Sequence, residues 1–142
     1  MPTISGRQKD LRPRGAVFQG EAAVPKAVEA ALKLAKQPVP TPLRVAIHVD
    51  TGAASTAVSN GLPGKLGLHP IGSATVSSAT TLGVSCPIYM LKLVLPKGVV
   101  FHLPVVESSI VFDQFDVLLG RDLLAHGLLV YNGQKNFFEL TF

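Results

Sequence analysis

Short runs in which apolar and polar residues alternate cover most of the chain, and from residue 43 onward the pattern is nearly continuous. A period of two is typical of strands that bury one face, and Gly, Pro, Asn and Ser separate the runs. The pattern predicts strands over residues 15–24, 43–49, 73–82, 86–95, 98–108 and 116–120, and a hairpin over 128–142. The segments 73–82 and 86–95 are predicted to pair as a second, longer hairpin.

One segment, residues 25–37, has the periodicity of a helix instead. It opens with a proline, which the first helical turn tolerates, and Glu29 and Lys33 are spaced to form an ion pair along it. The apolar residues that share one face of this helix are Val28, Ala31, Leu32 and Ala35. The proline-rich stretch 38–42 ends the helix and acts as a stiff connector. Pro104 is likewise expected to split the strand that contains it.

Composition supports a single globular domain. The chain has 142 residues, of which 47% are hydrophobic and only 15% charged, so a disordered chain is excluded. The net charge of +4 arises at the start, where residues 1–44 carry eight Lys or Arg against three Asp or Glu. We therefore expect residues 1–14 to be a basic flexible tail, 15–42 to hold a strand, the helix and the connector, and 43–142 to form the main domain. The tail lacks interleaved aromatic residues, so we do not expect it to bind nucleic acid.

The single cysteine and the absence of targeting signals bear on location. Cys86 alone cannot form an intrachain disulfide, and we expect it to be a small buried residue. No apolar run approaches membrane-spanning length, and the N-terminus lacks the apolar core of a signal peptide. These observations favour a cytoplasmic protein that does not enter a membrane.

The candidate chemistry lies in two short motifs. The run "IHVDTGAAST" places Asp50 directly after an apolar strand, and "DVLLGR" follows at 116–121. With these motifs, residues 43–142 resemble the retropepsin-like aspartic peptidases, including their bacterial members. The resemblance implies an all-β, retropepsin-like acid protease barrel with one Asp-Thr-Gly lobe per chain, preceded here by the strand–helix extension. It also implies an endopeptidase that hydrolyses peptide bonds without a metal or other cofactor.

The resemblance assigns a role to each motif residue. The catalytic residues would be Asp50, Thr51 and Gly52, with Thr51 hydrogen-bonding across to a partner loop. The substrate-binding residues would be Ala53 and Ala54 beside the carboxylate, and Ser78, Ala79, Thr80 and Thr81 in a flap hairpin over 77–86. The residues that support the site would be Thr56, Leu118, Leu119, Gly120 and Arg121.

The number of such loops predicts a homodimer. Two carboxylates that share one proton activate water and protonate the carbonyl, an arrangement for which aspartic proteases are the standard example. Only Asp50 is followed by Thr-Gly; none of Asp113, Asp116 and Asp122 is followed by Thr-Gly or Ser-Gly. Each chain would supply one Asp50 to a site on the two-fold axis. The apolar C-terminal segment 136–142 is a candidate interface strand.

One position departs from the retroviral pattern. The residue after Asp-Thr-Gly-Ala is often acidic there and pairs with the arginine of the later motif, whereas here it is Ala54. Arg121 therefore needs another partner, for which Asp122 and Glu139 are candidates. We expect Asp116 to cap or pair near the buried strand, and His48 to be structural.

Two other classes of function are considered. "DTGAAST" also fits the Asp-x-Gly-x-x-x-Thr phosphate loop of actin-like proteins and sugar kinases, but that fold needs two domains, and 142 residues are too few for it. The alternative that stays open is a catalytically silent dimeric module that binds peptides with the same fold. The four histidines are scattered without metal-ligand spacing, so no metal site is expected.

Overall fold

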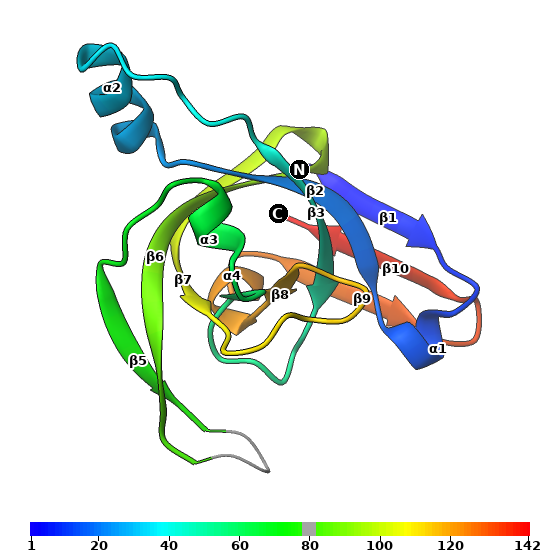
Figure 1. The fold of residues 1–142 in the computed structure, drawn as a ribbon. Helices are drawn as coiled ribbons and strands as arrows, with labels where there is room; N and C mark the ends of the chain where they lie inside the picture. Colours follow the sequence, from blue (N-terminus) through cyan, green and yellow to red (C-terminus); the bar gives the residue numbers. More distant parts are fainter. Residues whose placement is uncertain (78–81) are drawn as a thin grey trace.

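The computed structural model describes residues 1–77 and 82–142 and contains two sheets (Figure 1). Six strands close into a barrel in the order β2-β3-β8-β4-β7-β6, because β6 also pairs with β2. The barrel strands are β2 (Val17–Ala23), β3 (Leu43–Val49), β8 (Val117–Leu119), β4 (Ala57–Val58), β7 (Val99–Glu107) and β6 (Val84–Leu95). Strand β5 (Gly72–Val76) pairs with the first part of β6 as a hairpin beyond the barrel. The expectation of an all-β fold is confirmed.

Alternation along the strands produces the core inside the barrel. Every second residue of β3 faces inward, so Val45 and Ile47 are buried while Arg44 is exposed. The core residues that are least accessible to solvent include Ile47, Val58, Leu91, Leu93, Val105, Val117 and Leu119. These residues come from strands far apart in the sequence, so burial of their side chains holds the barrel closed. Of the described helices, none is long and apolar enough to cross a membrane.

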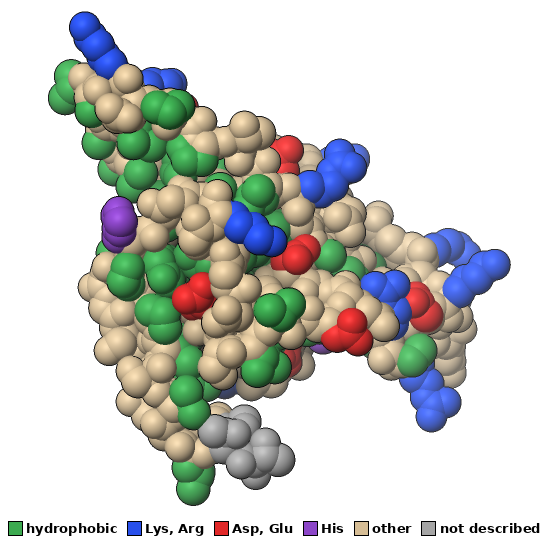
Figure 2. Space-filling model, viewed as in Figure 1, with side chains coloured by type: hydrophobic (Ala, Val, Ile, Leu, Met, Phe, Trp, Pro, Cys, Tyr) green, Lys and Arg blue, Asp and Glu red, His purple; other side chains and the backbone are tan. Residues whose placement is uncertain are grey.

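The second sheet corrects the prediction of a flexible tail. Strand β1 (Thr3–Arg7) pairs antiparallel with β10 (Phe137–Thr141), and β10 also pairs with β9 (Leu128–Asn132). A short helix, α1 (Leu11–Arg14), follows β1, and Ile4 and Leu11 are buried. Residues 1–14 thus form a folded basic end of the molecule, where Lys and Arg side chains gather at the right of Figure 2. Two buried apolar side chains and a distant strand partner hold it in place.

Helix α2 (Lys26–Leu34) confirms the predicted helix, but its surroundings are unusual. Its Pro25 is the N-cap residue, and Lys33 Nζ lies 3.0 Å from Glu29 Oε1, as the spacing predicted. None of the nine residues of α2 is buried in the described structure, and Leu34 is 87% exposed. Figure 1 shows α2 standing away from the barrel between β2 and β3. The apolar face that the sequence predicts therefore does not enter the core.

Strand β7 is continuous, so the prediction that Pro104 splits it is wrong. Pro104 lies opposite Met90 within the β6–β7 ladder. The N–H of Val106 donates to the carbonyl of Thr56 (3.1 Å) and so points toward β4. The nitrogen of Pro104, two residues earlier, points to the same side, where β4 pairs only with residues 106 and 107. The missing N–H consequently costs no hydrogen bond in the sheet.

The remaining elements are short. The helical segments besides α1 and α2 are α3 (Leu62–Lys65), α4 (Arg121–Leu124) and a 3-10 turn, η1 (Pro96–Gly98). The predicted hairpin over 128–142 is confirmed as β9 and β10, and the side chain of Asn132 accepts a hydrogen bond from the N–H of Lys135 within its turn. The strand order β1-β10-β9 leaves β10 paired on both edges.

Candidate active site

The site is built at the end of β3, where the sequence changes from an apolar strand to Asp50-Thr51-Gly52. The N–H of Asp50 donates to the carbonyl of Leu119 in β8 (3.0 Å), which ties the strand end to the neighbouring strand. Past this point the chain turns, and the N–H of Gly52 donates to Oδ1 of Asp50 (2.9 Å). Asp50 is half-buried, while Thr51 and Gly52 are exposed. The local turn orients the carboxylate, and Oδ2 has no hydrogen-bond partner among the described residues.

Beneath this loop, Thr56 and Asp122 form a hydrogen-bonded network. The backbone N–H of Thr56 donates to Oδ2 of Asp122 (2.9 Å), and its hydroxyl donates to Oδ1 (2.7 Å). The hydroxyl oxygen accepts in turn from the N–H of Gly120 (3.1 Å). Thr56 is fully buried, so these bonds satisfy polar groups that water cannot reach. Thr56 was predicted to support the loop; Asp122, its partner, was not assigned that role.

The segment "LLG" supplies a close approach between backbones. Strand β8 runs parallel to β3, with His48 opposite Leu118 and Val49 opposite Leu119. Leu119 is fully buried under the loop and Leu118 is half-buried. A Cβ on Gly120 would lie 2.6 Å from the carbonyl carbon of Ser55, so only glycine fits there.

Helix α4, which begins with Arg121 and Asp122, also binds the loop through its backbone and corrects the expected partner of Arg121. The N–H groups of Arg121 and Asp122 donate to the carbonyls of Ala53 (2.8 Å) and Ala54 (3.2 Å). Nη1 of Arg121 donates to the carbonyl of Thr51 (2.8 Å). Neither Asp122 nor Glu139 forms an ion pair with it in the described structure. The acidic side chain that Ala54 lacks is thus replaced by a backbone oxygen of the loop itself.

His48 is packed rather than exposed to the site. Its ring stacks on Phe115 at a centroid distance of 5.0 Å. Gly15 leaves room for the ring, since a Cβ there would lie 2.5 Å from Nε2 of His48. Nδ1 of His48 is buried without a partner among the described residues. This packing agrees with the structural role that the sequence suggested.

The other predicted residues fall into two groups. Asp116 pairs beside the buried strand as expected, because its Oδ2 accepts from the N–H of Ala46 (2.8 Å), and Cys86 is buried. The predicted flap residues Ser78, Ala79, Thr80 and Thr81 lie outside the described residues. The strands on either side of them, β5 and β6, form the antiparallel hairpin that was predicted.

The chemistry that this arrangement offers is that of one oriented carboxylate. Within residues 1–77 and 82–142, no three His, Cys, Asp or Glu side chains gather as a metal site. The loop of Asp50 is held by the first two residues of α4, through the Thr56–Asp122 network and the hydrogen bond from Arg121 to the Thr51 carbonyl. A carboxylate held in this way can accept or share a proton at a fixed position.

The closed barrel, with an Asp-Thr-Gly loop laid against a Leu-Leu-Gly segment, has the retropepsin-like fold. The structure resembles the crystal structure of a retropepsin-like aspartic protease from Rickettsia conorii, with a TM-score of 0.54 and 19% sequence identity. The alignment covers 99% of this chain and 94% of that chain. At this identity the likeness concerns the fold, and it extends over the N-terminal segment as well as the barrel. No protein-family model and no curated protein sequence matches the chain.

Proposed function

We propose that the protein is an aspartic endopeptidase that acts as a homodimer, with one Asp50 from each copy at a shared site. The observation that carries the proposal is the Asp50 carboxylate, which lies at the exposed end of β3 with one oxygen held by the Gly52 N–H. A turn that merely ended a strand would not require the buried Thr56–Asp122 network and the arginine clamp beneath it. These contacts restrict the movement of the carboxylate, as catalysis requires.

The proposed reaction follows from pairing two such carboxylates. Two close carboxylates cannot both ionise, so the pair holds one proton and titrates as a unit. The ionised member accepts a proton from a water molecule, which attacks the peptide carbonyl, and the protonated member donates to the carbonyl oxygen. On collapse of the tetrahedral intermediate, the first carboxyl returns its proton to the amide nitrogen and the second takes one from a hydroxyl. The C–N bond breaks, the amine and the carboxylic acid are released, and the pair is back in its starting state. Ala53 and Ala54 are proposed to line the substrate path beside the loop.

The partner surface that we propose differs from the one that the sequence suggested. Strand β10 has β1 on one edge and β9 on the other, so a partner strand cannot add to it. The free edge of β1 belongs to the basic end of the molecule, where two copies would bring like charges together. Strand β9 instead exposes two apolar side chains that alternate onto one face, Leu128 and Val130, whereas the hydroxyl of Tyr131 donates to the carbonyl of Leu11. We therefore assign the dimer contact to β9, which begins shortly after α4 and the Arg121–Thr51 contact.

The second candidate is a silent peptide-binding module with the same dimer. It would need the cleft and the two-fold symmetry but not the acid–base chemistry of Asp50. The intact hydrogen bonds around the carboxylate favour the peptidase. A single experiment distinguishes the two candidates.

The test compares the wild type with Asp50→Asn on a mixture of synthetic peptides of diverse sequence, from about pH 4 to 7. Mass spectrometry should detect cleavage by the wild type alone, because asparagine keeps the loop's shape but cannot exchange the proton. Circular dichroism and sedimentation serve as controls and should show that the two proteins are equally folded and equally dimeric. Equal cleavage by the two proteins would show a contaminating protease and overturn the assignment. Peptide binding by both proteins without cleavage would favour the silent module.

A further inference from the structure

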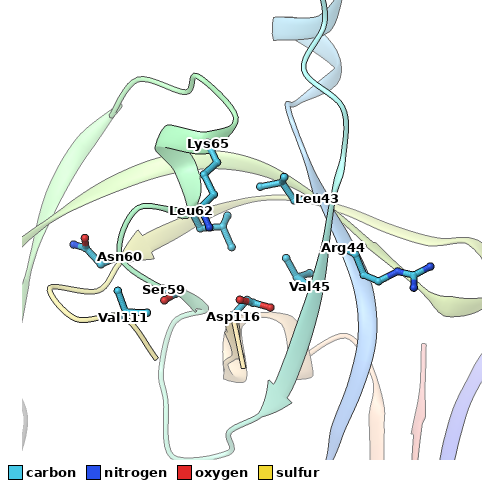
Figure 3. A pocket seen from close by; sticks show the side chains of 9 residues that line it. All are labelled: Leu43, Arg44, Val45, Ser59, Asn60, Leu62, Lys65, Val111 and Asp116. Atoms are coloured by element: carbon cyan, nitrogen blue, oxygen red, sulfur yellow. The ribbon is translucent and has the colours of Figure 1, made fainter. Parts of the chain in front are cut away.

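A cavity of about 360 Å³ lies at the other end of β3 from Asp50. It opens between the start of β3, the α3 turn and the loop that leads into β8 (Figure 3). Arg44 is six residues from Asp50, which corresponds to roughly 20 Å along a strand. The volume is in the range of ligand sites, roughly 300–1,000 Å³. The cavity is therefore separate from the proposed catalytic site and has room for a small ligand.

One wall of the cavity is an unpaired strand edge at Arg44. Both backbone groups of Ala46 pair with Asp116, through the Asp116 N–H and Oδ2, so they point away from β2. Residues two apart in a strand direct their backbone groups to the same side, so the N–H and C=O of Arg44 point the same way. Strand β8 pairs only with residues 47–49 of β3, and no described residue bonds these two groups of Arg44. Figure 3 shows the side chain of Arg44 directed away from the cavity, so its backbone forms this wall.

Charged and apolar groups surround this edge. Lys65 reaches into the cavity from α3 and has no ion-pair partner in the described structure. On the β8 side, Asp116 is held by the Ala46 N–H, and its second oxygen remains an acceptor. Leu62 and Val111 supply apolar surface, and Val111 is 71% exposed. The Lys65 ammonium group can bind a carboxylate, and the Asp116 carboxylate can accept from an N–H. The free N–H and C=O of Arg44 can pair with the backbone of a peptide.

We propose that this cavity binds an extended peptide that ends in a free carboxylate. The peptide adds beside β3, exchanging backbone hydrogen bonds with Arg44. Its terminal carboxylate meets the Lys65 ammonium group, and an N–H further from the terminus donates to Asp116. The last side chain, which is apolar, lies against Leu62 and Val111. The proposal does not depend on the peptidase activity, because it uses none of the residues near Asp50.

The test is a titration of the 15N-labelled protein with acetyl-Ala-Ala-Leu as the free acid, up to millimolar concentration. The amide signals of Arg44, Asn60 and Lys65 should shift and saturate. The same peptide with a C-terminal amide should bind about tenfold more weakly, since the charge that Lys65 attracts is absent. Lys65→Gln should lower affinity for the acid by a similar factor and leave the amide unaffected. Arg44→Ala is the matched control and should bind normally, because its backbone and not its side chain makes the contact.

Three results would overturn the proposal. Absence of any saturable shift would exclude the site, and shifts confined to Thr51–Ala54 would assign the peptide to the catalytic loop. Equal affinity for the acid and the amide would show that Lys65 does not bind the terminal carboxylate of the peptide. A peptide methylated on the leucine nitrogen tests the strand pairing itself, and it should bind more weakly than the parent if the backbone exchange occurs. Because Lys65 is exposed, its replacement should not unfold the chain.

Discussion

The carboxylate of Asp122 accepts two hydrogen bonds from Thr56, one from the backbone N–H at 2.9 Å and one from the hydroxyl at 2.7 Å. The two residues are 66 positions apart, so the pair fastens the loop after Asp50 to the start of α4. Oδ1 of Asp122 also accepts from the N–H of Leu123 (2.8 Å), so the carboxylate joins Thr56 to the first turn of α4. The geometry of the proposed catalytic loop therefore depends on a residue outside the Asp-Thr-Gly motif.

Replacing Thr56 by Val should destabilise the protein by about 1–3 kcal/mol, because Asp122 Oδ1 and the Gly120 N–H both lose a buried partner. Thr56→Ser keeps the hydroxyl and should lose much less. Urea unfolding of the three proteins measures the difference. A valine variant as stable as the wild type would contradict the importance of this network.

Gly120→Ala should be destabilising by about 1–3 kcal/mol, because the new Cβ would meet backbone atoms of Ser55 and Thr56 at 2.6–2.9 Å. The control is Gly64→Ala, since nothing lies within 4 Å of a Cβ in that position of α3. Thermal unfolding monitored by circular dichroism should separate the two. Equal melting temperatures for the two variants would contradict this prediction, because they would show that the backbone of Ser55 and Thr56 can move to make room for the Cβ.

Arg121→Gln separates positioning from stability. The side chain is exposed, so its replacement should change the free energy of unfolding by less than about 1 kcal/mol. It also removes the hydrogen bond to the Thr51 carbonyl, and the proposed peptidase should lose at least about tenfold in kcat/KM. Arg12→Gln, an exposed arginine on α1, is the control and should retain activity. Unchanged kcat/KM in Arg121→Gln would show that the clamp is not needed for turnover.

Val130→Glu tests the proposed dimer surface on β9. Val130 is 41% exposed in the single chain, so the change should not disturb the core, but it introduces two charges at the proposed interface. Sedimentation velocity should show a monomer, and peptidase activity should be lost with it. Val100→Glu, at a valine that is 45% exposed on β7, should remain dimeric and active. A Val130→Glu protein that stays dimeric would move the interface elsewhere.

Tyr89 provides a prediction about alkaline pH. Burial, together with the neighbouring Glu107 carboxylate, raises the pKa of Tyr89 above its ordinary value of 10.0. As pH rises through 10, the unfolded chain releases this proton before the folded chain does, so the free energy of unfolding falls. Tyr89→Phe should show a shallower loss of stability between about pH 9 and 11, measured by urea unfolding relative to pH 7. Parallel curves for the two proteins would contradict the raised pKa.

Local patterns predicted the strands of both sheets well after residue 15, because alternation and turn residues act over a few positions. The strand 43–49 and the hairpin over 128–142 appear with nearly the predicted bounds. The first 14 residues could not be predicted in this way. Their strand is polar apart from Ile4, and its partner is at the far end of the chain, so no nearby residue signals the pairing.

The site could be predicted in part for a similar reason. Asp50, Thr56 and Gly120 belong to motifs that can be read directly, and the structure brings all three together. The partner of Arg121 could not be predicted from the sequence, because it is a backbone carbonyl, a group that every residue carries. Asp122 was visible next to Gly120-Arg121, but its contact with Thr56 depends on how α4 meets the loop.

Strand β1 has a consequence for how the protein is made. Thr3 lies opposite Thr141, and these two residues are 138 positions apart in the chain. A ribosome synthesises β1 before β10, so β1 cannot pair until the chain through residue 141 has emerged. The sheet that joins them forms after the barrel strands are already available, and β9, which pairs with β10, appears only shortly before it. The β9 surface that we propose for pairing two copies is thus completed late in synthesis.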